Sequence, residues 1–361
     1  MTERFDWVIV GAGIAGASLA AGLAPHGRVL LLEAEDRPGY HASGRSVAFW
    51  TESYGGPLVL PLTAASRPFF DAHGLLGPRG ALTLARAGEA EELAAFMAEF
   101  SALGVRVEAQ DRADLEVRLP GLRAEWQLGA YEPDCSDIDV AGLHQLWLAQ
   151  ARRHGAELLC RARLAVASHG AEGWVIELDD GRSFAAPVLV NAAGAWADEV
   201  AGAAGLAPIG MAPLRRTVAQ LRMDQPVPAD LPLTLGLDGS FYFKPDSGKL
   251  WLSPHDEIPS PPCDAAPEEL DVALAIDRFE AVVDWRIAAL EHKWAGLRTF
   301  APDRLPVYGF DPAARDFFWF AGQGGFGIQT APAAADLALG LLLDRPSGAV
   351  DPAPYSPARF R

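Results

Sequence analysis

One stretch near the start of the chain restricts the fold more than any other feature of the sequence. Residues 7–10 (WVIV) are entirely apolar, which is typical of a strand covered on both faces. Gly11, Gly13 and Gly16 then complete the pattern G-x-G-x-x-G. In this pattern the first glycine allows a tight turn, the second lets the backbone approach a pyrophosphate, and the third lets the next helix pack against the strand. The stretch therefore predicts a strand–turn–helix unit that binds phosphate groups.

The residues that follow indicate a dinucleotide. A helix is predicted over 14–24, and its positive N-terminal end would face the phosphates. The second buried strand, RVLLLE (28–33), ends at Glu33, about 20 residues past the second glycine, where a carboxylate accepts hydrogen bonds from ribose hydroxyls. An acid at this position disfavours a ribose 2′-phosphate, so we expect NAD or FAD rather than NADP.

The rest of the chain favours FAD over NAD. Regular alternation of strands and helices does not continue after Glu33, because the next segment (34–56) is rich in Gly, Ser and Arg. A buried strand that ends in a small-residue turn comes only within 173–196, and a last strand enters a helix through a glycine turn within 317–343. Three such strand ends, spread over the chain, imply a nucleotide domain built from distant pieces. That arrangement suits a cofactor as long as FAD.

We therefore predict an α/β protein with an α+β second domain. Its discontinuous Rossmann-type FAD-binding domain would comprise 1–48, 140–210 and 301–361. The inserted substrate-binding domain would comprise 49–139 and 211–300. This second domain would be built on an antiparallel sheet, because strands with period two occur at 216–222 and 233–252.

Composition and charge exclude several classes of protein. The chain has 361 residues, of which 50 % are hydrophobic, and a formal net charge of −17, which argues against a nucleic-acid partner. Its apolar runs are interrupted before the ~20 residues that a membrane span needs, and no basic-then-apolar leader precedes the first strand. Three cysteines without a His/Cys cluster predict neither a disulfide framework nor a metal site. We expect a cytoplasmic protein with no integral membrane segment and no bound metal.

Seven stretches run collinearly from the N-terminus almost to the C-terminus: VIVGAGIAGAS, RPGYHASGRS, DIDVAGLHQ, VLVNAAGAW, FYFKPDSG, WAGLRTF and GQGGFGIQT. Together they resemble the D-amino-acid oxidase superfamily of FAD enzymes, and within it the bacterial D-arginine dehydrogenases most closely. The resemblance implies an FAD-dependent dehydrogenase or oxidase of D-amino acids. Such an enzyme moves a hydride from Cα to flavin N5, and the resulting 2-imino acid hydrolyses to a 2-oxo acid and ammonia.

The resemblance also implies the residues of the substrate site. Arg216 and Arg298 would hold the carboxylate, since a guanidinium binds this group with a planar fork. Tyr54 and Tyr242 would contribute hydroxyl contacts, and Gly325 would offer its backbone carbonyl to the substrate amine. Two further residues are expected in the substrate site, Thr51 and Gln329.

For the cofactor, the resemblance implies contacts along its whole length. The N-terminus of the last predicted helix, within 322–330, would stabilise negative charge on the reduced flavin. No cysteine occurs at 301–308, where some relatives attach the flavin covalently, so we expect noncovalent FAD. The predicted cofactor-binding residues are Gly11, Gly13, Ile14, Ala15, Gly16, Glu33, Ala34, His41, Ser43, Gly44, Arg45, Ser46, Val166, Ala193, Gly194, Trp196, Gly324, Gly325, Gly327, Ile328, Gln329 and Thr330.

Two positions depart from the arginine enzymes. Ala81 stands where they carry an acidic residue that receives the cationic side chain, and Phe49 stands where they have a histidine. Both changes remove polarity, and a buried guanidinium without a partner costs several kcal/mol. We therefore expect weak activity on D-arginine and a preference for apolar or small substrates.

Two other hypotheses for the function stay open. One is oxidation of secondary amino acids such as sarcosine, D-proline or iminodiacetate, whose two carboxylates the two arginines would hold. The other is a flavin-binding protein without this turnover, which as a tRNA-modification partner would need a basic surface, whereas the net charge is −17. The sequence does not discriminate between oxygen, a quinone and another carrier as electron acceptor, and it does not give the oligomeric state.

Overall fold

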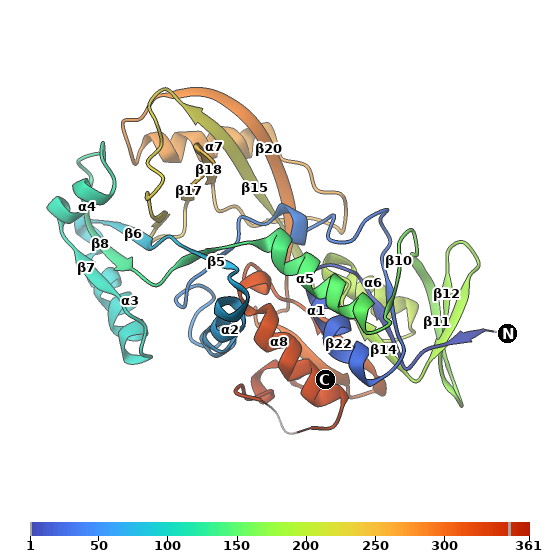
Figure 1. The fold of residues 1–361 in the computed structure, drawn as a ribbon. Helices are drawn as coiled ribbons and strands as arrows, with labels where there is room; N and C mark the ends of the chain where they lie inside the picture. The colour runs from blue at the N-terminus through green and yellow to red at the C-terminus, as the bar shows by residue number, and fades with distance from the viewer. Residues whose placement is uncertain (1, 346–347) are drawn as a thin grey trace.

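The computed structural model describes residues 2–345 and 348–361, and a six-stranded sheet lies at the base of the fold (Figure 1). Its strands are β2 (Trp7–Val10), β3 (Val29–Leu32), β10 (Glu157–Leu159), β14 (Val188–Asn191), β21 (Val307–Asp311) and β22 (Ala314–Ala321). The order is β10–β3–β2–β14–β22–β21, and every neighbouring pair is parallel except β21 with β22. Strands from the start, middle and end of the chain thus share one sheet.

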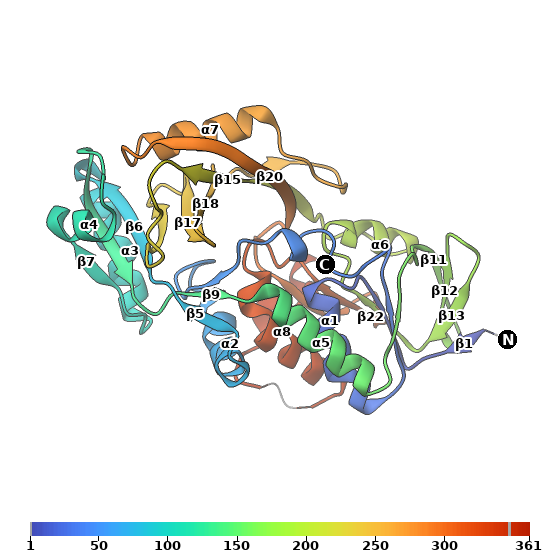
Figure 2. The ribbon, with the colours of Figure 1, turned by 45° about the horizontal axis from the view of Figure 1, so that its top comes forward.

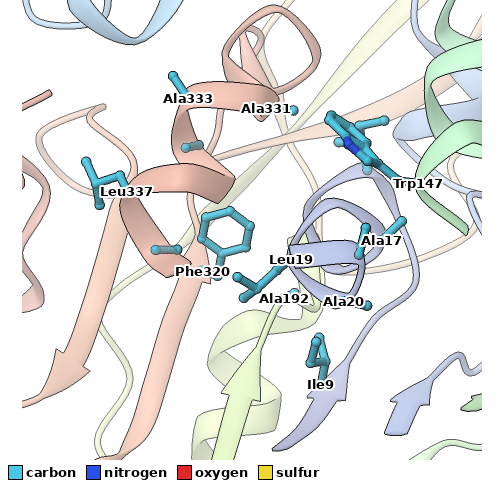
Figure 3. Packing of buried hydrophobic residues seen from close by; sticks show 14 of the residues in the cluster. Ile9, Ala17, Leu19, Ala20, Trp147, Ala192, Phe320, Ala331, Ala333 and Leu337 are labelled. Carbon is cyan, nitrogen blue, oxygen red and sulfur yellow. The ribbon is translucent and has the colours of Figure 1, made fainter. Parts of the chain in front are cut away.

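Helices cover one face of this sheet. They are α1 (Ile14–Leu23), α5 (Val140–Arg153) and α8 (Gly327–Leu342), with α2 (Leu60–His73) against α8. Figure 3 shows Leu19 of α1 next to Phe320 of β22, and Trp147 of α5 beside Ala17. Because α1 is made almost entirely of alanine, glycine and other small or apolar residues, it packs closely on the strands below.

The opposite face is covered by a second, four-stranded sheet and a short helix. The sheet consists of β1 (Glu3–Arg4), β11 (Leu164–Gly170), β12 (Gly173–Leu178) and β13 (Ser183–Ala186), and the helix is α6 (Ala197–Ala203). Trp174 and Ile176 of β12 share a buried cluster with Val8, Leu189 and Phe317 of the six-stranded sheet. The six-stranded sheet is therefore buried on both faces, which explains why its strands are continuous apolar runs.

The largest sheet lies above this three-layered part (Figure 2). It contains β6 (Ala81–Arg86), β7 (Glu108–Gln110), β8 (Trp126–Glu132), β15 (Ala212–Met223), β16 (Leu233–Gly236), β17 (Tyr242–Asp246), β18 (Lys249–Ser253), β19 (Ile258–Pro259) and β20 (Ile287–Phe300). Its pairs are antiparallel apart from β16 with β6. The long pair β15–β20 reaches from this sheet toward the base of the fold.

Shorter elements complete the structure. Helices α3 (Ala90–Ala102) and α4 (Arg112–Arg118) pack against β8, and α7 (Glu269–Glu280) packs against β15 and β18. A small antiparallel sheet joins β4 (Phe49–Trp50), β5 (Leu76–Pro78) and β9 (Ser136–Ile138). The mixed fold, with a parallel and a largely antiparallel sheet, agrees with the predicted class. The domain boundaries stay a proposal: 1–48, 140–210 and 301–361 for one domain, 49–139 and 211–300 for the other.

No helix within residues 2–345 and 348–361 combines the length and the apolar character that crossing a bilayer requires.

Candidate active site

The glycine turn after β2 forms a cradle made of backbone. Gly11 has a φ of +102°, and a Cβ atom there would lie 2.5 Å from the carbonyl oxygen of Ala192 at the end of β14. A Cβ atom at Gly16 would overlap the carbonyl oxygen of Gly11. Side chains are thus excluded at both positions, and α1 begins directly above the ends of two neighbouring parallel strands. This is the place where α/β sheets bind dinucleotides.

Glu33 follows β3 at the same edge of the sheet and is already oriented. The Glu33 carboxylate accepts hydrogen bonds from the backbone N–H of Ala12 (3.1 Å) and of Glu35 (3.0 Å), and Glu33 is only 8 % exposed. Ser43, from the predicted cofactor loop, accepts a hydrogen bond from the N–H of Ile14 at 2.8 Å. The loop is therefore tied to the first turn of α1.

A single cavity of about 330 Å³ connects this turn with the inner side of the largest sheet. It is lined by strand ends of the six-stranded sheet, by the loop 39–47, by β15 and β20, and by the start of α8. The structure brings the following predicted residues to its wall: Gly11, Gly13, Ile14, Ala15, Glu33, Ala34, His41, Ser43, Arg45, Ser46, Ala193, Gly194, Trp196, Arg216, Tyr242, Arg298, Gly324, Gly325, Gly327 and Ile328.

Other predicted cofactor residues lie outside the cavity wall. Gly16, Gly44 and Thr330 pack behind it, where Gly44 N–H donates to Gly39 and Thr330 Oγ1 to Phe326. Val166 lies on β11 and is 46 % exposed, and the neighbouring residues 162–164 line the cavity in its place. The difference of a few residues arises because β11 begins only at Leu164 and carries Val166 out toward solvent.

Arg45 and His41 line the cavity, but their polar groups are used within the protein. Arg45 Nη1 donates to the carbonyl oxygens of Ala265 (2.8 Å) and Ala295 (3.0 Å), and its Nη2 pairs with Asp264. His41 Nε2 lies 3.0 Å from Glu35 Oε1. These side chains hold the walls of the cavity in place.

The residues present fit FAD. The backbone cradle supplies a phosphate site, Glu33 lies at the wall where a ribose hydroxyl donor is expected, and the glycines before α8 leave that helix N-terminus open to the cavity. At Gly325, just before α8, the backbone lies close to side chains of the substrate end. A Cβ atom there would overlap the hydroxyl of Tyr54 and lie 2.7 Å from Arg298 Nη1.

Arg298 is the central charge at the far end of the cavity. It lies on β20, its Nη1 donates to the Tyr54 hydroxyl at 2.6 Å, and no carboxylate in the described residues lies within 4.0 Å of its nitrogens. Although burial opposes its charge, the phenols of Tyr54 and Tyr242 and the Glu257 carboxylate keep the pKa of Arg298 above its ordinary value. This guanidinium is a cation whose anion is not supplied by the described protein.

Arg216 lies on β15, next to the strand of Arg298, and is 4 % exposed. Its Nε donates to the carbonyl oxygen of Asp256 at 2.5 Å and its Nη2 to Glu257 at 3.3 Å. Burial, and then the positive charge of Arg298, lower the pKa of Arg216. Its Nη1 and the hydroxyl of Tyr242 are buried without any hydrogen-bond partner in the described residues. Such orphaned donors are costly unless a ligand satisfies them.

Apolar and aromatic groups close the side of this end. The Phe49 ring lies 5.3 Å from the Tyr54 ring and 6.4 Å from the Tyr242 ring, measured between centroids. Phe49 and Ala81 are buried in one cluster with Tyr242. The two departures noted in the sequence therefore pack against Tyr242, and neither of them lines the cavity.

Thr51 and Gln329 support Tyr54 from behind and do not line the cavity. Gln329 accepts from Thr51 N–H (3.2 Å) and donates to the Tyr54 carbonyl oxygen (3.1 Å), while Thr51 Oγ1 donates to Glu132 Oε2 at 2.8 Å. Ser53 also donates to Glu132. Burial raises the pKa of Glu132, which is 5 % exposed. Sequence reasoning missed Glu132, because it lies at the end of β8 within no recognisable motif.

His144 and His255 were also missed as parts of the site. His144 reaches from α5 to the glycine turn, where its Nε2 lies 2.9 Å from the carbonyl oxygen of Ala12. Burial, and then the charges of Arg216 and Arg298, lower the pKa of His255 to about 3, so its ring is neutral at neutral pH. The His255 ring lies 5.6 Å from that of Tyr242, and no signal in the sequence marks this contact or that of His144, although His144 falls inside one of the matched stretches, DIDVAGLHQ.

Comparison with known proteins shows the family of this chain. The profile of the DAO family, described as FAD dependent oxidoreductase, matches residues 6–340. The chain belongs to this family of FAD-dependent oxidoreductases, and FAD is its cofactor. The closer likeness to D-arginine dehydrogenases stays a prediction.

The names of several relatives are those of enzymes that act on amino acids. Glycine oxidase of Geobacillus kaustophilus (strain HTA426) is 27 % identical over 99 % of this chain and 98 % of its own length. The crystal structure of glycine oxidase from that organism has a TM-score of 0.88 at 25 % identity and covers 100 % of both chains. L-proline dehydrogenase from P. horikoshii (TM-score 0.87, 20 % identity, 100 % and 98 % coverage) and iminodiacetate oxidase from Chelativorans sp. BNC1 (TM-score 0.81, 19 % identity, 97 % and 98 % coverage) share the fold. This confirms the predicted fold class.

Proposed function

We propose that this protein oxidises the C–N bond of small or apolar α-amino acids, with the D configuration where a side chain is present. The products are a 2-imino acid, then a 2-oxo acid and ammonia. When bound, FAD supplies the acceptor for the hydride from Cα. The protein's own residues bind the substrate, orient its α-hydrogen and exclude charged side chains.

The observation that carries this proposal is the pair of guanidiniums at one end of the cofactor cavity. Arg298 has no carboxylate partner within the described residues, and Arg216 Nη1 and the Tyr242 hydroxyl have no hydrogen-bond partner there. An amino acid carboxylate would satisfy all three groups at once, through the planar fork that suits it. The requirement for such an anion is strong, because unpaired buried charges are costly.

The substrate amine would lie on the other side of the clamp. Gly325 is close to Arg298 and Tyr54, with no side chain between, so its backbone carbonyl is available to accept a hydrogen bond from the amine. Two fixed ends, the carboxylate and the amine, define which substituent of Cα faces the cofactor. This positioning is the protein's main contribution to the reaction.

Substrate size follows from Phe49 and Ala81. Both are buried beside Tyr242 and neither offers a charge or a hydrogen bond to a side chain. Glu132 is engaged with Thr51 and Ser53, so it is not free to receive a guanidinium. These contacts support glycine, D-alanine and other uncharged substrates over D-arginine.

A second candidate is oxidation of secondary amino acids such as sarcosine, D-proline and iminodiacetate. The names of two solved relatives, iminodiacetate oxidase and L-proline dehydrogenase, favour it. The carboxylate clamp is equally suited to sarcosine and D-proline, because it leaves the substituents on nitrogen unspecified.

The test is anaerobic bleaching of the flavin band by a panel of both enantiomers of small amino acids, glycine, sarcosine, D-proline, iminodiacetate and D-arginine. We expect bleaching by small D-amino acids and little by D-arginine. Higher turnover on the secondary amines would give the second candidate precedence, and no bleaching by any amine would refute both. Hydrogen peroxide formation in air then decides whether oxygen is the acceptor.

A further inference from the structure

Glu257 is an acid beside the binding site: it does not line the cavity but pairs with Arg216, which does. β19 pairs with the start of β15, with Ile258 opposite Arg215 and Pro259 opposite Leu214. The same register, continued by one residue, brings Glu257 opposite Arg216, and its Oε1 lies 3.3 Å from Arg216 Nη2. Sequence-distant residues are thus fixed as a cross-strand ion pair.

Arg304 holds the same carboxylate from the outer side. Its Nη2 lies 2.8 and 2.9 Å from the two oxygens of Glu257, and its guanidinium stacks 4.0 Å from the Phe300 ring. The Arg304 side chain is 53 % exposed and that of Glu257 is 35 % exposed. Glu257 therefore bridges a surface arginine and the buried arginine of the clamp.

Two of the five N–H groups of Arg216 take part in these contacts. The Asp256 carbonyl oxygen takes Nε and Glu257 takes Nη2, which leaves Nη1 for a ligand. Together with the Tyr242 hydroxyl and Arg298, Nη1 is enough for one carboxylate. A second carboxylate on the substrate would have to compete with Glu257 for Arg216.

The charges agree with this count. Arg216, Arg298 and Arg304 provide three positive charges, and Asp256 and Glu257 provide two negative ones. One positive charge remains, which a single substrate carboxylate neutralises. A dicarboxylate would leave an excess negative charge in a mostly buried site, where repulsion between like charges is strong.

Resting on the proposed function, we propose that Glu257 is a specificity-determining residue that selects amino acids with one carboxylate and rejects those with two. The negative charge of Glu257 occupies the position at Arg216 that a second substrate carboxylate would need. In consequence, iminodiacetate and D-aspartate are poor substrates of this enzyme compared with sarcosine and D-alanine.

The experiment compares substrates that differ by one carboxylate: iminodiacetate with sarcosine, and D-aspartate with D-alanine. For the holoenzyme and each variant, the ratio of kcat/KM for the dicarboxylate to that for the monocarboxylate is measured. Glu257→Gln keeps the size of the side chain and removes its charge, so the ratio should rise about tenfold. Arg304→Gln leaves the charge of Glu257 less neutralised, so the ratio should fall. The opposite signs exclude a general effect of weakened folding.

Glu268→Gln is the matched control. Glu268 pairs with Arg215, which neighbours Arg216 on the other face of β15. The variant therefore removes a carboxylate charge from a similar place, and it changes no contact of Arg216. Its ratio should stay within about twofold of the wild type, since exposed ion pairs contribute little. An unchanged ratio in Glu257→Gln, or an equal rise in Glu268→Gln, would overturn the proposal.

A binding measurement separates this proposal from the proposed function. Acetate and malonate differ by one carboxylate, and their Kd values follow from the change that they cause in the flavin spectrum. If Glu257→Gln tightens malonate relative to acetate while no amine is oxidised, the assignment of Glu257 stands and the proposed reaction fails. If amines are oxidised and the malonate-to-acetate ratio does not change, only the assignment of Glu257 fails.

Discussion

The two ends of the cavity are built on opposite principles. At the dinucleotide end the wall is mainly backbone, and its buried acid, Glu33, already has two N–H donors. At the substrate end the wall consists of side chains, and Arg216 Nη1 and the Tyr242 hydroxyl have no partner among the described residues. At Gly11 and Gly16 the first end has no room for a Cβ atom, whereas the second end depends on groups that must not be removed. Each prediction below tests one side of this contrast.

The largest effect on cofactor binding is expected from one added methyl group at the dinucleotide end. In Gly16→Ala the new Cβ would lie 1.8 Å from the carbonyl oxygen of Gly11, so the glycine turn or the start of α1 would have to shift. We expect FAD affinity to fall by about a hundredfold. The measurement is the ratio of flavin to protein absorbance after gel filtration, together with the Kd for added FAD.

The control for this variant is Gly202→Ala. Gly202 lies on α6, and a Cβ atom there meets no heavy atom of the described residues within 4 Å, its own helix backbone aside. This variant should keep its full flavin content. Normal flavin content in Gly16→Ala would contradict the close fit of α1 on the strand end.

Removal of a charge at the substrate end should affect FAD binding less, and it should lower the rate of the reaction strongly. Arg298→Met keeps much of the volume of the side chain and loses the guanidinium. We expect kcat/KM for the best amino acid to fall about a thousandfold, since truncating one member of a desolvated charge pair costs several kcal/mol. Flavin content should be unchanged, and steady-state kinetics on the holoenzyme measures the loss.

Arg222→Met is the matched control, because Arg222 lies on β15 and pairs with Glu291 at the surface. Its kinetics should equal those of the wild type. Loss of FAD in Arg298→Met would mean that the two ends are not independent, and the contrast between them would fail.

A weaker effect is expected from Tyr54→Phe, which removes only the hydroxyl that accepts from Arg298 at 2.6 Å. The ring and its contact with Phe49 remain. A hydrogen bond to a charged group contributes roughly 1.5–3 kcal/mol, so kcat/KM should fall by about ten- to 150-fold. An effect as large as that of Arg298→Met would place Tyr54, and not the guanidinium, at the centre of the clamp.

The same contrast explains how much the sequence could predict. Gly11, Gly13 and Glu33 are near one another in the chain, and backbone geometry restricts what can stand there, so a local pattern predicts the dinucleotide end. The substrate end joins β15, β17, β20 and the segment 51–54, which come together only through the pairing of distant strands. Arg216, Arg298 and Tyr54 were therefore expected only by resemblance.

Residues that modulate the arginines could not be predicted at all. Glu257 contacts Arg216, and Asp256 contacts Thr217, because β19 pairs with β15 in one register. No pattern in the sequence specifies that register. Thr51 and Gln329 were expected near the substrate and instead hold the segment that carries Tyr54. A position in a matched motif fixes the neighbourhood of a side chain, but only packing decides which way it faces.

The smallest predicted effect concerns pH, and it compares one histidine from each end. The pKa of His255 is lowered from 6.5 to about 3 by burial and by the charges of Arg216 and Arg298. Between these two pH values the unfolded chain binds a proton that the folded protein does not, so the free energy of unfolding decreases as the pH falls from 6.5 toward 3. His255→Asn removes this titrating group. The free energy of unfolding of this variant should therefore decrease between pH 7 and pH 5 by about 2 kcal/mol less than that of the wild type.

His144→Asn is the comparison from the dinucleotide end, and it should reduce the pH dependence of stability less than His255→Asn does. The reason is that the hydrogen bond to Ala12 and the charge of Glu33 oppose the effect of burial on the pKa of His144. Urea unfolding of the holoprotein at both pH values and one fixed FAD concentration gives these differences. An equal pH dependence in His255→Asn and the wild type would show that the arginine pair does not make the substrate end electropositive, and the reason for expecting an anion there would be lost.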